Sequence, residues 1–314
     1  MIQIKATFLD EISSDIPHQN WGFEEWDRDF ASMKQMGIDT VVMIRSGLRQ
    51  FITYPSPILM NELGCYEPSV DLVDMFLTLA EKYDMKYFFG TYAMRRNGDY
   101  KDVDLSKTWD TERRLLDEVW ERYGCRKAFK GWYLSKEVGD ADNLQIIEEF
   151  VRYSGYCKSI SGNLPTLISP GMHGRKCWLP NDPNARDLDF AKHESDWDKI
   201  MGIISGHVDI IAFQDGHVTF DELPAALKVN KRLADKHGIE LWTNCESFDR
   251  DMPFRFPPIK WDKMRLKLKA AQEAGIERAI TFEFSHFMSP NSFWPQAGNL
   301  FKRYMEWIEA NREG

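Results

Sequence analysis

The chain has 314 residues, of which 43% are hydrophobic and 28% charged, and its formal net charge is −9 at pH 7. This composition is ordinary for a globular enzyme. The acidic balance argues against nucleic acid and anionic membrane surfaces as partners, because both require a basic footprint.

Short apolar runs alternate with amphipathic stretches along the first half of the chain. The apolar runs are typical of buried strands, and the stretches after them have the apolar spacing of helices. The predicted strands are 4–10, 40–47, 86–93 and 129–137, and the predicted helices are 24–36, 69–83, 111–123 and 142–160. Gly37 and Gly124 directly follow the first and third helices, as expected at helix C-termini.

The second half of the chain repeats this order. The predicted strands are 165–171, 208–216, 240–247 and 278–287, and the predicted helices are 195–205, 220–238, 261–275 and 294–312. The strands are apolar almost throughout, which is typical of a parallel sheet that is covered on both sides.

Eight strand–helix units in succession predict an α/β protein folded as a single (β/α)₈ TIM barrel. No linker interrupts the alternation, so residues 1–314 are predicted to form one catalytic domain. A doubly wound open sheet is the alternative. Such a sheet usually carries a Gly-rich phosphate loop after an early strand, and this sequence has none.

Cysteine usage and the absence of long apolar runs bear on location. The five cysteines are scattered and include no CxxC pair, which indicates neither a disulfide framework nor a zinc site. No apolar run approaches the roughly 20 residues of a membrane helix. The N-terminus enters a strand without the features of a signal peptide. We therefore expect a cytoplasmic protein, unless a leader has been removed.

Two glutamates are the candidate catalytic residues. In a (β/α)₈ barrel the active site lies at the carboxyl ends of the strands, and Glu137 ends the fourth predicted strand while Glu246 ends the seventh. A retaining glycosidase needs two carboxyl groups about 5–5.5 Å apart. No ion-pair partner is obvious beside Glu246, although pairing with an arginine or capping the next helix are the structural alternatives for it.

Further polar and aromatic residues near the strand ends are predicted to bind the substrate. They are Asp10, Trp21, Arg45, Tyr92, His173, Trp178, Gln214, Asp215, His217, Glu283 and His286.

Several of these residues have an alternative structural role. Trp21 could instead hold its loop onto the first helix, and Asp215 could simply form a turn with the glycine after it. Strand alternation places Glu283 on one face with Thr281. If Glu283 points inward, it needs a partner such as Arg45 or is itself an acid of the site.

The placement of the two glutamates resembles the large clan of (β/α)₈ glycoside hydrolases with the acid/base after strand 4 and the nucleophile after strand 7. The resemblance implies that Glu137 is the acid/base and Glu246 the nucleophile. That clan usually has Asn before the acid/base and Trp at the end of strand 8. This chain has Lys136 at the first position and the segment FEFSHFMSP at the second.

A second resemblance extends over nearly the whole chain. It is carried by ATFLDEISSDIPHQNWGFEEWDRDFASMKQMGIDTVV near the N-terminus, by AFQDG in the sixth strand and by SHFMSP after the eighth. These segments resemble the family grouped as domain of unknown function 4434, whose members are often described as glycoside hydrolases. The resemblance implies the barrel but supplies no substrate.

The leading prediction is therefore a retaining glycoside hydrolase that acts on carbohydrate and uses no cofactor and no metal. One alternative is a sugar isomerase or epimerase that depends on a divalent metal. Its ligands would come from Glu137, His173, Asp215, His217, Glu246 and Glu283. A non-catalytic carbohydrate-binding barrel is the third possibility. The sequence predicts no particular oligomeric state.

Overall fold

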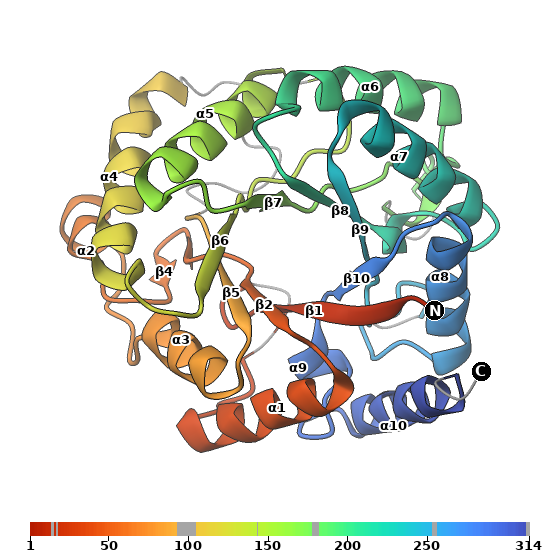
Figure 1. Cartoon of the computed structure of the whole chain (residues 1–314), viewed down its shortest axis with the longest axis horizontal. Helices are drawn as coiled ribbons and strands as arrows, with labels where there is room; N and C mark the ends of the chain where they lie inside the picture. The colour runs from red at the N-terminus through yellow and green to blue at the C-terminus, as the bar shows by residue number, and fades with distance from the viewer. Residues whose placement is uncertain are drawn as a thin grey trace.

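The computed structural model describes residues 1–13, 16, 18–92, 105–142, 144–177, 182–252 and 256–311. Its centre is a closed barrel of parallel strands in the order β1-β10-β9-β8-β7-β6-β5-β2 (Figure 1). These strands are β1 (Gln3–Leu9), β2 (Thr40–Met43), β5 (Lys86–Gly90), β6 (Phe129–Tyr133), β7 (Thr166–Ile168), β8 (Ile210–Gln214), β9 (Glu240–Asn244) and β10 (Arg278–Thr281). The predicted (β/α)₈ barrel is confirmed.

Helices surround this barrel, one after nearly every strand (Figure 1). The longer ones are α1 (Phe23–Met36), α3 (Leu72–Lys82), α4 (Leu105–Tyr123), α5 (Leu144–Ser161), α6 (Phe190–Ile204), α7 (Leu223–His237), α8 (Trp261–Glu273) and α10 (Pro295–Ala310). Helix α1 ends as predicted at Gly37, whose φ of 91° lies in the left-handed region that glycine adopts without strain. No helix in the described ranges is long and apolar enough to cross a membrane.

The barrel interior is filled by side chains from alternate strand positions. The buried residues of this cluster are Ala6, Phe8, Val42, Ile44, Phe88, Tyr133, Leu167, Ile210, Ala212, Trp242 and Ile280. Glycine at position 131 makes room for one of them, because a Cβ there would lie 2.2 Å from the Phe88 ring. Since side chains alternate along a strand, the next inward positions, Gln214, Asn244 and Phe282, lie at the carboxyl end of the barrel.

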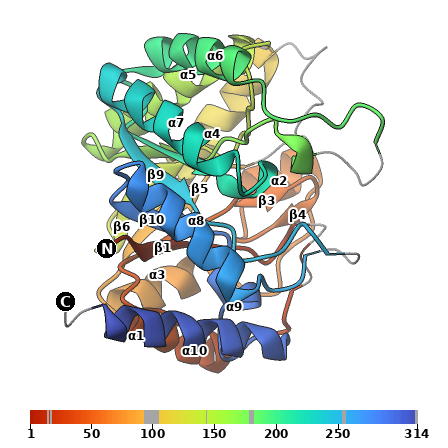
Figure 2. The same ribbon diagram turned by 90° about the vertical axis from the view of Figure 1, so that its right-hand side faces the viewer.

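Several short elements at the strand ends were not predicted. They are the hairpin of β3 (Gly47–Leu48) and β4 (Phe51–Ile52), helices α2 (Pro57–Leu63) and α9 (Phe284–Phe287), and the 3₁₀ turns η1 (Arg175–Cys177) and η2 (Asp215–His217). Figure 2 shows the hairpin on the side of the barrel away from the two chain termini.

The eighth strand is shorter than predicted, which changes the interpretation of Glu283. Strand β10 ends at Thr281, and Glu283 is the N-cap of α9, whose side chain accepts hydrogen bonds from the backbone N–H groups of Ser285 and His286. The alternation argument that placed Thr281 and Glu283 on one strand face is therefore wrong. An N-cap carboxylate satisfies helix N–H groups that have no partner within the helix.

Candidate active site

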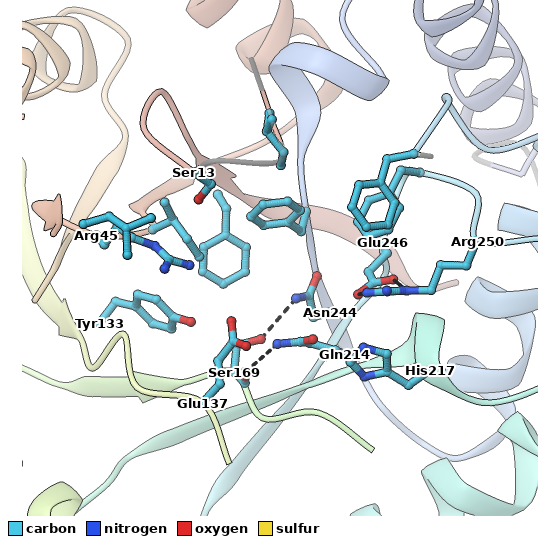
Figure 3. A pocket seen from close by; sticks show the side chains of 17 residues that line it. Ser13, Arg45, Tyr133, Glu137, Ser169, Gln214, His217, Asn244, Glu246 and Arg250 are labelled. Atoms are coloured by element: carbon cyan, nitrogen blue, oxygen red, sulfur yellow. Dashed lines mark hydrogen bonds and ion pairs between the residues drawn. The ribbon is translucent and has the colours of Figure 1, made fainter. Parts of the chain in front are cut away.

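A cavity of about 630 Å³ lies at the carboxyl ends of the barrel strands (Figure 3). Its polar lining residues are Ser13, Arg45, Tyr133, Glu137, Ser169, Gln214, His217, Asn244, Glu246 and Arg250. Its apolar lining residues are Phe8, Ile16, Ile44, Leu48, Phe248, Phe256 and Phe282. A pocket of this size, with apolar walls and a few convergent polar groups, is typical of small-molecule sites. Both predicted catalytic glutamates line it.

Glu246 is held ionised by Arg250. Its side chain is buried, and its Oε2 and Oε1 accept hydrogen bonds of 2.9 Å from Nε and Nη2 of Arg250. Burial by itself would raise the pKa of Glu246, but attraction to Arg250 and these hydrogen bonds outweigh it and lower the pKa to about 2. The ion pair with an arginine, named in the sequence analysis as a structural alternative for Glu246, is present, because the loop after β9 folds Arg250 back onto it.

Two charged residues fix the position of Glu246, namely Asp215, which directly follows β8, and Lys267 of α8. Asp215 Oδ1 accepts a hydrogen bond of 3.0 Å from the backbone N–H of Glu246. Lys267 Nζ lies 2.6 Å from that Oδ1 and donates to the Glu246 carbonyl oxygen at 2.9 Å. Asp215 is 1% exposed and is not part of the lining. It therefore orients Glu246 instead of contacting the cavity, contrary to the prediction that it binds substrate.

Gly216 is required by the close approach of Glu246. A Cβ at this position would lie 1.7 Å from Glu246 Oε2 and 2.9 Å from Arg250 Nε. Only glycine leaves room for the carboxylate here. The Asp–Gly dipeptide that reads as an ordinary turn in the sequence thus shapes the candidate site.

Glu137 lies on the Ser169 side of the cavity and Glu246 on the Arg250 side, with Gln214 between them in this view (Figure 3). The Gln214 Nε2 donates to the Ser169 carbonyl oxygen at 2.9 Å. Nearby, Asn244 Nδ2 donates to Ser169 Oγ at 3.1 Å. These hydrogen bonds hold the Gln214 and Asn244 side chains in place in the cavity wall.

Lys136, which stands where the glycosidase clan usually has asparagine, points away from the cavity. Its Nζ forms a buried ion pair with Glu149 of α5 and lies 3.6 Å from Glu112 of α4. Because side chains alternate in extended chain, Glu137 faces the cavity when Lys136 faces the helices. The lysine therefore has a structural role and is no polar contact for a ligand.

His217 is a neutral imidazole at the cavity wall. Burial and the nearby positive charge of Arg250 lower its pKa to about 4. At neutral pH the ring therefore has one N–H donor and one acceptor nitrogen. This suits hydrogen bonding to hydroxyl groups.

Some polar atoms of the lining are buried and have no hydrogen-bond partner among the described residues. They are Ser13 Oγ, Arg45 Nε, His217 Nδ1 and Asn244 Oδ1. An unsatisfied buried polar group costs about 1–3 kcal/mol. The four residues come from four separate segments and all line one cavity, so the cavity wall carries polar groups that the described residues do not satisfy.

Glu283 and His286, both predicted to bind substrate, are buried outside the cavity lining. Glu283 Oε1 lies 2.5 Å from His286 Nδ1. Glu283 is thus paired with a histidine of its own helix, and Arg45, its suggested partner, faces the cavity instead.

Two further carboxyl groups lie near Glu283. Burial is the main cause that raises the pKa of Glu11 to about 7, and the nearby negative charge of Glu283 adds to it. Burial likewise raises the pKa of Asp29 to about 7, although Ser289 and Asn291 donate hydrogen bonds to its Oδ1. Among the residues that the structure describes, neither Glu11 nor Asp29 pairs with a lysine or arginine.

Asp10 and Trp21 are not part of the cavity lining either. Asp10 Oδ1 accepts hydrogen bonds from the backbone N–H groups of Ile12 and Ser13, at 3.1 and 2.9 Å. Asp10 thereby holds the loop that carries Ser13 into the cavity. Trp21 packs edge-on against Trp26 with ring centroids 5.0 Å apart, which is the loop-holding role that the sequence left open.

Tyr92 and His173 also lie outside the lining. The Tyr92 hydroxyl donates to the carbonyl oxygen of Arg49, in the β3–β4 turn. The His173 side chain is 54% exposed, and its Nδ1 lies 3.2 Å from Asp140 Oδ2. Trp178, the remaining predicted binding residue, lies outside the described residues.

Several lining residues were not predicted, namely Ser13, Tyr133, Ser169, Asn244, Arg250 and the aromatic residues Phe248, Phe256 and Phe282. Strand parity could have identified Asn244 and Phe282, which continue the inward series of β9 and β10. Phe282 supplies an aromatic side chain at the end of the eighth barrel strand, where the glycosidase clan usually has tryptophan. Arg250 and Phe256 carry no such signal because they belong to a loop.

The described part of the chain contains no group of three or more His, Cys, Asp or Glu side chains placed to hold one metal ion. The residues suggested as metal ligands are distributed over three places. Glu137, His217 and Glu246 line the cavity, Asp215 and Glu283 are buried behind its wall, and His173 is exposed.

The model of the family described as domain of unknown function (DUF4434) matches residues 4–294. The chain belongs to this family. The crystal structure of a "putative alpha-L-fucosidase" from Bacteroides thetaiotaomicron is 55% identical and superposes with a TM-score of 0.92, over 98% of this chain and 94% of that one. No curated protein matches the chain.

More distant structures share the fold. An endo-β-1,4-mannanase from Thermotoga petrophila is 14% identical, with a TM-score of 0.55 over 89% of this chain and 67% of that one. An intracellular xylanase from Thermoanaerobacterium saccharolyticum is 12% identical, with a TM-score of 0.53 over 90% of this chain and 85% of that one. The barrel is therefore of the kind found in glycoside hydrolases.

Proposed function

We propose that this protein is a retaining glycoside hydrolase in which Glu246 is the nucleophile and Glu137 the acid/base. The observation that carries the proposal is the cavity at the strand ends. Two glutamates that follow the fourth and seventh barrel strands line it, together with residues whose buried polar atoms have no partner in the described part of the chain. The similarity to a protein named a putative α-L-fucosidase and the glycosidase-like barrel support it.

The environment of Glu246 suits a nucleophile. With a pKa of about 2 the carboxylate is ionised at any pH at which the enzyme would work. Arg250 occupies both oxygens, but each carboxylate oxygen has a second lone pair with which to attack. The same arginine stabilises the carboxylate as it leaves again in the second step. Gly216 and Asp215 hold the group in place.

The reaction follows in two displacements. Glu246 attacks the anomeric carbon while Glu137 gives its proton to the departing glycosidic oxygen, so one C–O bond breaks and an ester to Glu246 forms. Glu137, now ionised, takes a proton from water, which attacks the anomeric carbon and releases Glu246. Two inversions leave the anomeric configuration unchanged. His217, Gln214 and Asn244 would hold sugar hydroxyls, and Phe282 and Phe248 would contact the apolar face of the ring.

The proposal is tested with aryl glycosides that carry activated leaving groups, α-L-fucosides among them. Glu137→Ala should lower kcat by about 10²–10⁴-fold, and Glu246→Ala should lower it further. Glu273→Ala, an exposed change on α8, is the control for removal of a glutamate. Azide should rescue both variants, yielding a glycosyl azide of retained configuration from Glu137→Ala and of inverted configuration from Glu246→Ala.

The initial product anomer, followed by NMR, gives the stereochemistry directly. A product of inverted configuration, or unchanged turnover in either alanine variant, would contradict the proposal. Chelator treatment separates the metal-dependent isomerase. The glycosidase should keep its activity in EDTA, whereas a metal-dependent isomerase would lose it.

A further inference from the structure

The positive charges around the candidate site are matched by carboxylates, with one exception. Arg250 pairs with Glu246 at 2.9 Å, and Lys267 pairs with Asp215 at 2.6 Å. Arg45, in contrast, forms no hydrogen bond or ion pair with any residue that the structure describes, although its Nε is buried. Arg45 is half-buried, so its guanidinium is partly withdrawn from water at the cavity wall with no carboxylate paired to it, and an anionic partner would be favoured there.

The backbone at Arg45 is fixed from both sides. The N–H of Ile44 donates to the carbonyl of Leu9 at 3.0 Å, and the N–H of Ser46 donates to the carbonyl of Gly90 at 2.8 Å. These bonds continue the pairing of β2 with β1 and β5 past the end of the strand. Arg45 is thus presented from a rigid strand end and not from a mobile loop, which is how binding groups are best positioned.

The guanidinium of Arg45 and the hydroxyl of Tyr133 point into the same part of the cavity (Figure 3). This part lies across the cavity from Glu246 and Arg250 in the same view. Asn244, whose buried Oδ1 has no partner among the described residues, lines the cavity between these two sides. A ligand bound at Glu246 would therefore reach Arg45 with another of its substituents.

We infer that the sugar bound in this cavity carries an anionic group, a carboxylate or a sulfate ester, which Arg45 binds. The planar guanidinium fork matches the oxygens of such groups through paired charge-assisted hydrogen bonds. The Tyr133 hydroxyl adds a donor on the same side. That the anionic sugar is a substrate rests on the proposed glycosidase function. That Arg45 binds an anionic sugar can be tested by binding measurements, without catalysis.

Equilibrium binding is measured calorimetrically on the whole protein. The probes are D-glucuronate and D-galacturonate, the 6-sulfates of D-glucose and D-galactose, and the neutral sugars D-glucose, D-galactose and L-fucose. Uronates or sulfates should bind about 10–100-fold more tightly than the neutral sugars, as expected for charge-assisted hydrogen bonds. Comparing the uronates with the sugar sulfates identifies which anionic group the site binds.

Arg45→Met removes the charge and keeps much of the side-chain volume, so it should abolish the preference for anionic sugars by weakening their binding far more than that of neutral sugars. Arg45→Lys should retain part of the preference, since lysine keeps the charge but not the fork. Arg265→Met on α8 removes an arginine whose side chain is 56% exposed and should change nothing. Circular dichroism confirms the fold of each variant.

Equal binding of neutral and anionic sugars, no binding of any anionic probe, or an equal loss for all probes in Arg45→Met would overturn the inference. The hydrolase proposal can fail separately. If no glycoside is cleaved but the anionic preference persists and depends on Arg45, the anion subsite stands and the glycosidase assignment falls. If a neutral glycoside is cleaved with full efficiency by Arg45→Met, the assignment stands and the subsite falls.

Discussion

Two groups of acidic residues lie at the same end of the barrel and differ in the cations that face them. In the paired group, consisting of Asp215, Glu246, Arg250 and Lys267, the carboxylates face cations at 2.6–2.9 Å. In the acid group, consisting of Glu11, Asp29, Glu283 and His286, the only ion-pair partner that the described residues provide is a histidine.

The two groups show that a strand-end position does not by itself decide the protonation state of a carboxyl group. Desolvation acts on both groups, but at Glu246 the charge and hydrogen bonds of Arg250 outweigh it, and the pKa is about 2. At Glu11 the charge of His286 does not outweigh it, nor do the hydrogen bonds to Asp29, and both pKa values are about 7. Of the acidic residues in these two groups, Glu246 lines the cavity and the others do not. The arginine beside Glu246 therefore keeps a carboxylate ionised at the candidate site.

Removing the cation from the paired group should have the largest effect. Arg250→Met leaves Glu246 buried and unpaired, which should cost about 3–5 kcal/mol of the free energy of unfolding at pH 7. The variant should regain stability toward acid pH, where Glu246 can be protonated. Urea denaturation at pH 7 and pH 5 measures both effects. The double variant Glu246→Gln/Arg250→Met should recover most of this lost stability. If Arg250→Met alone costs less than about 1 kcal/mol, the pair behaves as a solvent-exposed ion pair.

The acid group should make the protein less stable as pH rises. A carboxyl group with a folded pKa of about 7 and an ordinary value of 4.5 binds an extra proton in the folded state between those values. Its stabilisation is complete below pH 4.5 and is lost as pH rises through 7. Glu11→Gln should make this loss in the free energy of unfolding smaller by about 3 kcal/mol.

Denaturation curves of wild type and Glu11→Gln across this pH range provide the measurement. Glu24→Gln, which changes an exposed glutamate of α1, is the matched control and should leave the pH dependence as it is in the wild type. An identical pH dependence of stability in wild type and Glu11→Gln would mean that Glu11 is ionised in the folded protein.

Crowding the paired group without changing its charges should affect activity more than stability. Gly216→Ala places a Cβ 1.7 Å from the present position of Glu246 Oε2, so the carboxylate must move. A displacement of about 1 Å at a reacting group can cost 10²-fold in rate. We expect kcat to fall about 100-fold while the protein remains folded. Gly155→Ala, at an open position on α5 without a left-handed φ, serves as a glycine control for the fold. Full activity in Gly216→Ala would contradict the role given to Glu246.

A change away from both groups should be the mildest. Tyr92→Phe removes the hydrogen bond to the Arg49 carbonyl, which is worth about 1 kcal/mol of stability. Because Tyr92 does not line the cavity, kcat/KM should change less than about twofold, a difference too small to signify loss of a transition-state contact. A large kinetic effect would restore Tyr92 as a binding residue.

The barrel could be predicted from the sequence because it depends on local patterns. Apolar strand segments and amphipathic helices repeat along the chain, and every predicted barrel strand is present. The strand-end rule also identified Glu137, Glu246, Arg45, Gln214 and His217 as lining residues. Glu137, Gln214 and Glu246 continue the inward alternation of their strands, set by Tyr133, Ala212 and Trp242. Arg45 and His217 do not follow this alternation.

Tertiary structure decided which of the remaining polar residues face the cavity. Glu283 became a helix cap because β10 ends at Thr281, and Asp215 turned to Lys267 of a helix fifty-two positions further along the chain. Arg250 reached Glu246 through a loop. These pairings depend on contacts between segments that no local period relates. The sequence thus determined the barrel and the end at which its chemistry lies, whereas the charge of each carboxyl group was set by which cation the folded chain brings to it.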